Sequence, residues 1–227
     1  MVSPSKDMGV DYMVKVDSQP WLRSAPTGVT HSSRTFFSDV ATCNTTCLTP
    51  DPAGPTTTSG MDAHLGAYVS ASLRWTSSPT SSDNDFVFVT TFKAFTNLPI
   101  LVFEQAYPNG AQGTRPLNGG SNHHLGSFFP SWSRSSPDTV KSLQTFAGNG
   151  QSGSARGPWQ TVDYGGGIQG GVPLVLYQPT AKDGRTLAPR AVVMSPLGNY
   201  MVSEWLIEGV MQCRHVAFIH LSDTPPS

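Results

Sequence analysis

The segment of residues 98–113 constrains the fold more than any other part of the sequence. It reads LPILVFEQAYPNGAQG, an apolar run that ends in a Pro-Asn-Gly turn. Pro99 stands at the beginning of the run, where a strand tolerates a missing backbone donor. The preceding run, residues 86–95, begins with apolar residues on both faces, which predicts a central strand. Because only a short connection separates the two runs, they predict an antiparallel hairpin.

The composition extends this prediction to the whole chain. Charged residues make up 13% of the 227 residues, and too few are Glu or Lys to cover helical surfaces. The 22 glycines and 19 prolines supply turns. Further strands are expected at residues 11–16, 34–37, 66–75, 139–146, 172–177, 191–195, 201–207 and 216–221. Within residues 66–75, alternation places Val69, Ala71, Leu73 and Trp75 on one face. Residues 19–22 are expected to lead out of the first strand, and the glycine run at residues 165–167 is expected in a loop. A helix competes only at residues 200–212, where strand is favoured. Roughly ten strands without a composition break predict one all-β domain over residues 1–227, a large antiparallel β-sandwich.

The charge and hydropathy exclude several classes of partner. The net charge is −1, which gives no electrostatic reason to expect nucleic acid or an anionic membrane. The apolar runs are too short to span a bilayer. The first residues lack the apolar core of a signal peptide, so we expect either a cytosolic protein or a fragment whose leader lies elsewhere. The compartment stays unassigned.

The cysteines leave the redox state open. Cys43 and Cys47 flank Asn44-Thr45-Thr46, which has the form of a glycosylation site. A small disulfide would form there in an oxidising compartment and would leave Cys213 odd. Ordinary thiols in a Thr-rich loop are the favoured interpretation.

No residue pattern predicts catalysis, a metal or a cofactor. His123 and His124 are adjacent, so they point in opposite directions on an extended chain, and no other ligand stands nearby. Glu104 lies inside an apolar strand, but it has no matching second carboxylate, and Arg74 is a candidate partner for it. The segment around Ser152 misses the nucleophile-elbow pattern by one position.

Three aromatic residues are the candidates for ligand binding. Trp132, Trp159 and Tyr164 stand in segments rich in Gly, Ser and Pro. Flat aromatic rings stack on the C–H faces of sugars, so exposed rings in sandwich loops would contact an oligosaccharide. The alternative, which we favour for any single one of them, is that the ring folds back and plugs the end of the sandwich.

Several segments together resemble the N-terminal β domain of eukaryotic raffinose synthases and family-36 α-galactosidases. The resembling segments are residues 12–26 (YMVKVDSQPWLRSAP), 100–114 (ILVFEQAYPNGAQGT), 127–132 (SFFPSW), 171–177 (GVPLVLY) and 193–202 (VMSPLGNYMV). Their order and spacing agree with the family across most of the chain. Residues 139–165 depart from the family pattern, which has a Gly-Tyr strand there.

The resemblance implies a galactose-mutarotase-like supersandwich that precedes a catalytic (β/α)8 barrel. The catalytic acids of the family lie on that barrel, so no catalytic residue maps onto this chain, which would be a fragment with a non-catalytic role in carbohydrate metabolism. Two alternatives remain: a free-standing carbohydrate-binding sandwich, and a structural β-protein that assembles with itself.

Overall fold

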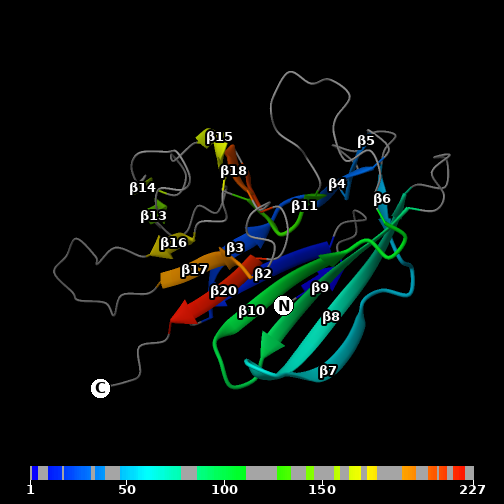
Figure 1. Ribbon diagram of the computed structural model, residues 1–227, viewed down its shortest axis with the longest axis horizontal. Helices are drawn as coiled ribbons and strands as arrows, with labels where there is room; N and C mark the ends of the chain where they lie inside the picture. Colours follow the sequence, from blue (N-terminus) through cyan, green and yellow to red (C-terminus); the bar gives the residue numbers. More distant parts are fainter. Residues whose placement is uncertain are drawn as a thin grey trace.

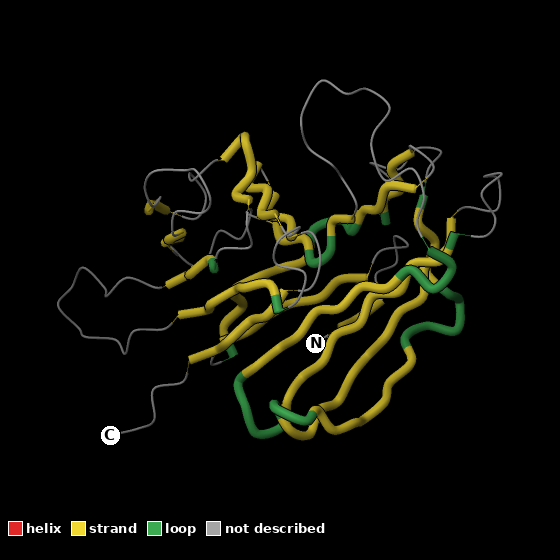
Figure 2. The backbone as a smooth tube through the Cα atoms, viewed as in Figure 1, coloured by secondary structure: helices red, strands yellow, loops and turns green. Residues whose placement is uncertain are grey.

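The structure is a computed structural model. It describes residues 2–4, 10–16, 18–31, 34–38, 47–77, 86–110, 127–133, 142–145, 156–158, 164–169, 173–177, 191–197, 204–208, 210–213 and 217–222. In these ranges the regular structure is β-strand with no helix (Figure 2). The strands pair antiparallel throughout, apart from one isolated parallel bridge between Phe37 and Cys47. The predicted all-β class with antiparallel sheets is confirmed.

The strands form three sheets (Figure 1). The seven-stranded sheet has the order β1 (Val2–Pro4), β2 (Val10–Val16), β3 (Gln19–Ser24), β12 (Ser131–Ser133), β19 (Val210–Cys213), β18 (Glu204–Glu208), β15 (Tyr164–Gln169). The three-stranded sheet has the order β11 (Ser127–Phe128), β4 (Gly28–His31), β5 (Arg34–Phe37).

The ten-stranded sheet is the largest. Its main path is β14 (Arg156–Pro158), β13 (Ser142–Thr145), β16 (Leu174–Tyr177), β17 (Ala191–Pro196), β20 (Ala217–Ser222), β10 (Ile100–Ala106), β9 (Val87–Phe95), β8 (Gly66–Ser77), β6 (Leu48–Pro50). The tenth strand, β7 (Thr56–Asp62), pairs with the other end of β8. In Figure 1, β7 to β10 run side by side as the long cyan and green strands.

One cluster of buried side chains joins the sheets. Its members include Tyr12, Trp21 and Trp132 from the seven-stranded sheet, Leu73, Phe88 and Phe103 from the ten-stranded sheet, and Val29 and Phe36 from the three-stranded sheet. The ring of Trp132 meets that of Phe103 edge-on, with 5.3 Å between the ring centroids. Such edge-to-face pairs stabilise a core by about 0.5–1.5 kcal/mol beyond the area they bury. Side chains of the two large sheets therefore pack directly on one another.

The predicted hairpin at the centre of the sequence is confirmed. Strands β9 and β10 pair antiparallel along six residues, from Leu101↔Ala94 to Ala106↔Val89. Val87 and Phe88 are both buried, so the start of β9 is covered on both faces as expected. The chain then turns after β10, where Gly110 donates its N–H to the carbonyl of Tyr107 at 2.9 Å. Gly110 has a φ of 75°, which glycine adopts without strain.

Other strands differ from the sequence prediction in number and extent. The described residues form twenty strands rather than ten, and many of them are only two to four residues long. Residues 19–22 were expected to lead out of the first strand, but they belong to β3, because Pro20 lies at a register irregularity where a missing donor is tolerated. The glycine run at residues 165–167 lies within β15 rather than in a loop. The segment 200–212 contains β18 and β19, so no helix forms in its described residues.

Candidate functional site

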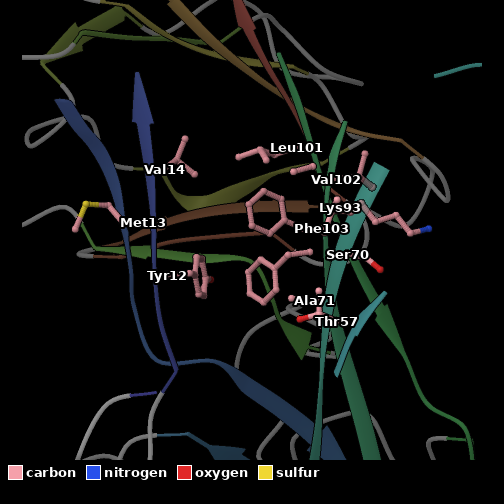
Figure 3. Close-up of a pocket in the computed structure, with 13 residues that line it drawn as sticks. Tyr12, Met13, Val14, Thr57, Ser70, Ala71, Lys93, Leu101, Val102 and Phe103 are labelled. Atoms are coloured by element: carbon pink, nitrogen blue, oxygen red, sulfur yellow. The ribbon is translucent and has the colours of Figure 1, made fainter. Parts of the chain in front are cut away.

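An apolar cavity of about 250 Å³ lies between β2 and the β7–β10 part of the large sheet. Tyr12, Met13 and Val14 contribute the wall from β2. Figure 3 shows Leu101 and Phe103 pointing toward this wall from β10. The lining is mostly apolar, with Thr57, Ser70 and Lys93 among its polar members, which suits the binding of an apolar group.

Strand alternation and register place Ala71, Phe92, Leu101 and Phe103 of the cavity lining on one face of the sheet, whereas Ser70, Lys93 and Val102 alternate to the other face. Leu101 and Phe103 are two positions apart on β10 and therefore point to the same side. Phe103 pairs with Phe92 of β9, which in turn pairs with Ala71 of β8. These paired residues form a continuous apolar strip across three neighbouring strands.

Along β8, this apolar face of the sheet is buried at one end of the strand and exposed at the other. Val69, Leu73 and Trp75 share one face of β8, as the sequence predicted. Leu73 and Trp75 are fully buried, whereas Val69 is 46% exposed. Met61 of β7 lies on the same face and is 74% exposed. Val69 lines the cavity, and the exposed side chains of Val69 and Met61 form an apolar rim on this face of the sheet.

The hydroxyl of Tyr12, one of the polar groups of the cavity lining, is hydrogen-bonded within the fold. The Tyr12 hydroxyl donates to the carbonyl of Ser131 at 2.9 Å and accepts the N–H of Ser131 at 2.8 Å. Burial raises the pKa of Tyr12 well above its ordinary value, and the Ser131 hydrogen bond acts in the opposite direction. The phenol therefore stays neutral at physiological pH and links β2 to β12.

Glu104, the acid considered from the sequence, forms an ion pair. Its Oε1 lies 2.5 Å from Nζ of Lys93, not beside Arg74. The same ammonium lies 5.1 Å from the ring centroid of Tyr68. Glu104 is one residue from Phe103 on β10, so it points to the opposite face of the sheet from the cavity. Figure 3 shows Lys93 extending away from Tyr12 and Val14. The carboxylate is thus compensated and stands apart from the cavity.

The three aromatic candidates are not shown to form a common site. Trp132 lies in β12 between β3 and β19, and its side chain is fully buried. Its ring packs on Tyr12 and Phe103, so no sugar can stack on it in this conformation. Tyr164 lies in β15 opposite Ile207 of β18, in a strand rather than the expected loop. Trp159 lies outside the described residues.

The remaining predictions concern metals, cysteines and membranes. His123 and His124 lie outside the described residues. The described part of the chain holds no group of three His, Cys, Asp or Glu side chains that could bind a metal ion. Cys47 is disulfide-bonded, so the favoured interpretation of ordinary thiols is wrong for this residue. Among the described residues, no helix is long and apolar enough to cross a membrane.

The sequence predicted strands at β2, β8, β9 and β10, but it predicted neither β7 nor the cavity. Alternation places Val69 and Leu73 on one face, but it cannot show that only Leu73 of these two is buried.

Comparison with known proteins adds no relative, since no family model, curated protein or solved structure matches this chain.

Proposed function

We propose that this chain is a non-catalytic β-sandwich domain of a carbohydrate-active protein, related to glycoside hydrolases and galactosyl-transferring enzymes. Its role is to pack beside a catalytic (β/α)8 barrel and to lend surface to the sugar pocket of that barrel. The sequence support is the ordered resemblance of five segments to the raffinose synthase and α-galactosidase family. The structural support is a core to which two large antiparallel sheets contribute side chains, as a supersandwich requires.

The apolar cavity carries the proposal. A glycosidase site needs two carboxyl groups facing each other across the sugar, and no Asp or Glu of the described ranges lines this cavity. An apolar cavity with an exposed rim instead suits the insertion of apolar side chains from a neighbouring domain. Val69 and Met61 supply that rim.

The burial of Trp132 favours the packing role over a free-standing carbohydrate module. A sugar-binding module needs an accessible ring, and Trp132 would have to leave the core to provide one. We therefore assign Trp132 to the core of the domain. Any contact with an oligosaccharide would come from other residues at the rim of the barrel pocket.

The natural polypeptide tests the proposal. An antibody raised against this chain recovers the protein from its source, and mass spectrometry identifies all of its peptides. We expect a polypeptide larger than the 24.3 kDa of this chain, with barrel peptides and activity on α-galactosides. Recovery of the 24.3 kDa chain alone would overturn the proposal.

A matched pair of variants in the recovered protein tests the docking role of the cavity. Val69→Asp places a charge at the exposed rim and should weaken packing of the two domains. Leu98→Asp places the same charge at a side chain that is 38% exposed in the β9–β10 turn, outside the cavity lining. We expect Val69→Asp to lower the thermal midpoint and activity of the whole protein more than Leu98→Asp. Equal effects would argue against docking at the cavity.

A further inference from the structure

Strand β7 forms an edge of the ten-stranded sheet. Among the described residues it pairs with β8 alone, from Thr56↔Ser72 to Asp62↔Gly66. Figure 1 shows it at the margin of the sheet, outside β8. On such a strand, alternate residues present a backbone N–H and C=O away from the sheet, and these groups can pair with another strand.

The β7 edge lacks the features that usually prevent pairing. Natural edge strands carry lysine, proline or a bulge, whereas residues 56–61 read TTTSGM without a charge. Proline occurs only before the strand, at Pro55. The register with β8 is continuous, without a bulge, and the side chains from Thr56 to Ser59 are exposed.

The ring of Tyr68 covers Gly60 in strand β7. A Cβ atom at Gly60 would lie 2.5 Å from the Tyr68 hydroxyl, so the Tyr68 ring covers the glycine on the face opposite the cavity. Aromatic cover of this kind stabilises a glycine in a strand at a sheet edge. The edge is therefore a formed strand rather than a frayed end.

Asp62, the last residue of β7, carries the charge of this strand. Its Oδ1 accepts the N–H groups of His64 at 2.8 Å and Leu65 at 2.9 Å. These two hydrogen bonds, that of Leu65 being the larger influence, lower the pKa of Asp62. The Asp62 carboxylate therefore points into the turn that follows β7, and the middle of the β7 edge carries no charge.

We propose that a second copy of this chain pairs with β7, antiparallel and centred on Ser59, so that the two large sheets become continuous. This register pairs all seven residues of β7, with Thr56 of one copy opposite Asp62 of the other. The two Asp62 residues then lie about 20 Å apart along the strands, beyond the screening length at ordinary salt. In this register the exposed side chain of Met61 of each copy lies opposite Thr57 of the other.

Sedimentation equilibrium of the purified chain tests the pairing. We expect a monomer–dimer equilibrium for the natural sequence. Ser59→Lys brings two ammonium groups together at the two-fold axis and should weaken dimerisation about tenfold or more. Ala53→Lys adds the same charge at an exposed turn residue outside β7 and should leave the equilibrium unchanged. A monomer at all concentrations, or equal effects of both variants, would overturn the proposal.

Cross-linking tests the register and does not depend on the lysine variants. Directly opposed residues in an antiparallel pair have Cα atoms about 4.5–5.5 Å apart, within the range for a disulfide. Ser59→Cys should give a reducible covalent dimer under mild oxidation, whereas Ala53→Cys and the natural sequence should not. Failure of Ser59→Cys to cross-link more than these controls would refute the register. Both tests read only the oligomeric state, so they stand independently of the proposed function.

Discussion

The change Trp132→Ala tests whether this tryptophan belongs to the core or to a sugar-binding surface. The side chain is fully buried, and its ring meets Tyr12 at 5.1 Å and Phe103 at 5.3 Å between centroids, both edge-on. Replacing a buried tryptophan by alanine removes its buried area and leaves a cavity, at a cost of about 3–5 kcal/mol. A domain is typically stable by only about 5–15 kcal/mol, so this is a large part of the total.

Urea unfolding, followed by circular dichroism, measures the effect of this change. We expect Trp132→Ala to lower the free energy of unfolding by the full amount, and Leu98→Ala, at a half-exposed position, by about 0.5 kcal/mol. Trp132→Phe should cost less than the alanine variant. Phenylalanine keeps an aromatic ring and removes the Trp132 Nε1–H, which is buried and has no acceptor among the described residues. Unchanged stability of Trp132→Ala, combined with loss of oligosaccharide binding, would refute the core assignment.

Three further predictions concern other parts of the fold. Gly60→Ala should destabilise the protein by about 1–3 kcal/mol, because its Cβ would overlap the Tyr68 ring; in a Tyr68→Ala background a double-mutant cycle should show this cost removed. Glu104→Gln should cost less than about 1 kcal/mol in urea unfolding, and less still at high salt, because the ion pair with Lys93 is partly exposed; a larger, salt-independent loss would contradict this. Burial raises the pKa of Tyr107 from 10.0 to about 12, against the opposing effect of its Ser127 hydrogen bond. Its stabilising contribution should therefore be complete below pH 10 and lost as the pH rises through 12, a decline that unfolding midpoints would show and Tyr107→Phe would reduce.

Local patterns predicted the strands whose residues pack on near neighbours. The apolar run that contains Phe88 and the adjoining run that contains Phe103 form β9 and β10, because alternation and a short connection determine a hairpin locally. The common face of Val69, Leu73 and Trp75 was predicted in the same way.

Features that depend on distant segments could not be predicted. Trp132 stands in a sequence rich in Ser and Pro; pairing with β3 and β19 places its strand inside the sheet, and its ring is buried against Tyr12 and Phe103. Glu104 pairs with Lys93 because the β9–β10 register brings the two side chains together, whereas the sequence had offered Arg74 as a candidate partner. The cavity likewise depends on how far β2 extends over β8 and β9. None of these distances is encoded in a local pattern.

Turnover by the purified chain is the most direct test of the claim that this domain is not itself catalytic. Fluorogenic α-galactosides are incubated with the chain and, separately, with its Glu104→Gln variant. We expect release no faster than in buffer for both proteins, because Glu104 is compensated by Lys93 and none of the carboxylates that the structure describes lines the cavity. Turnover by the natural sequence that Glu104→Gln abolishes would contradict the account.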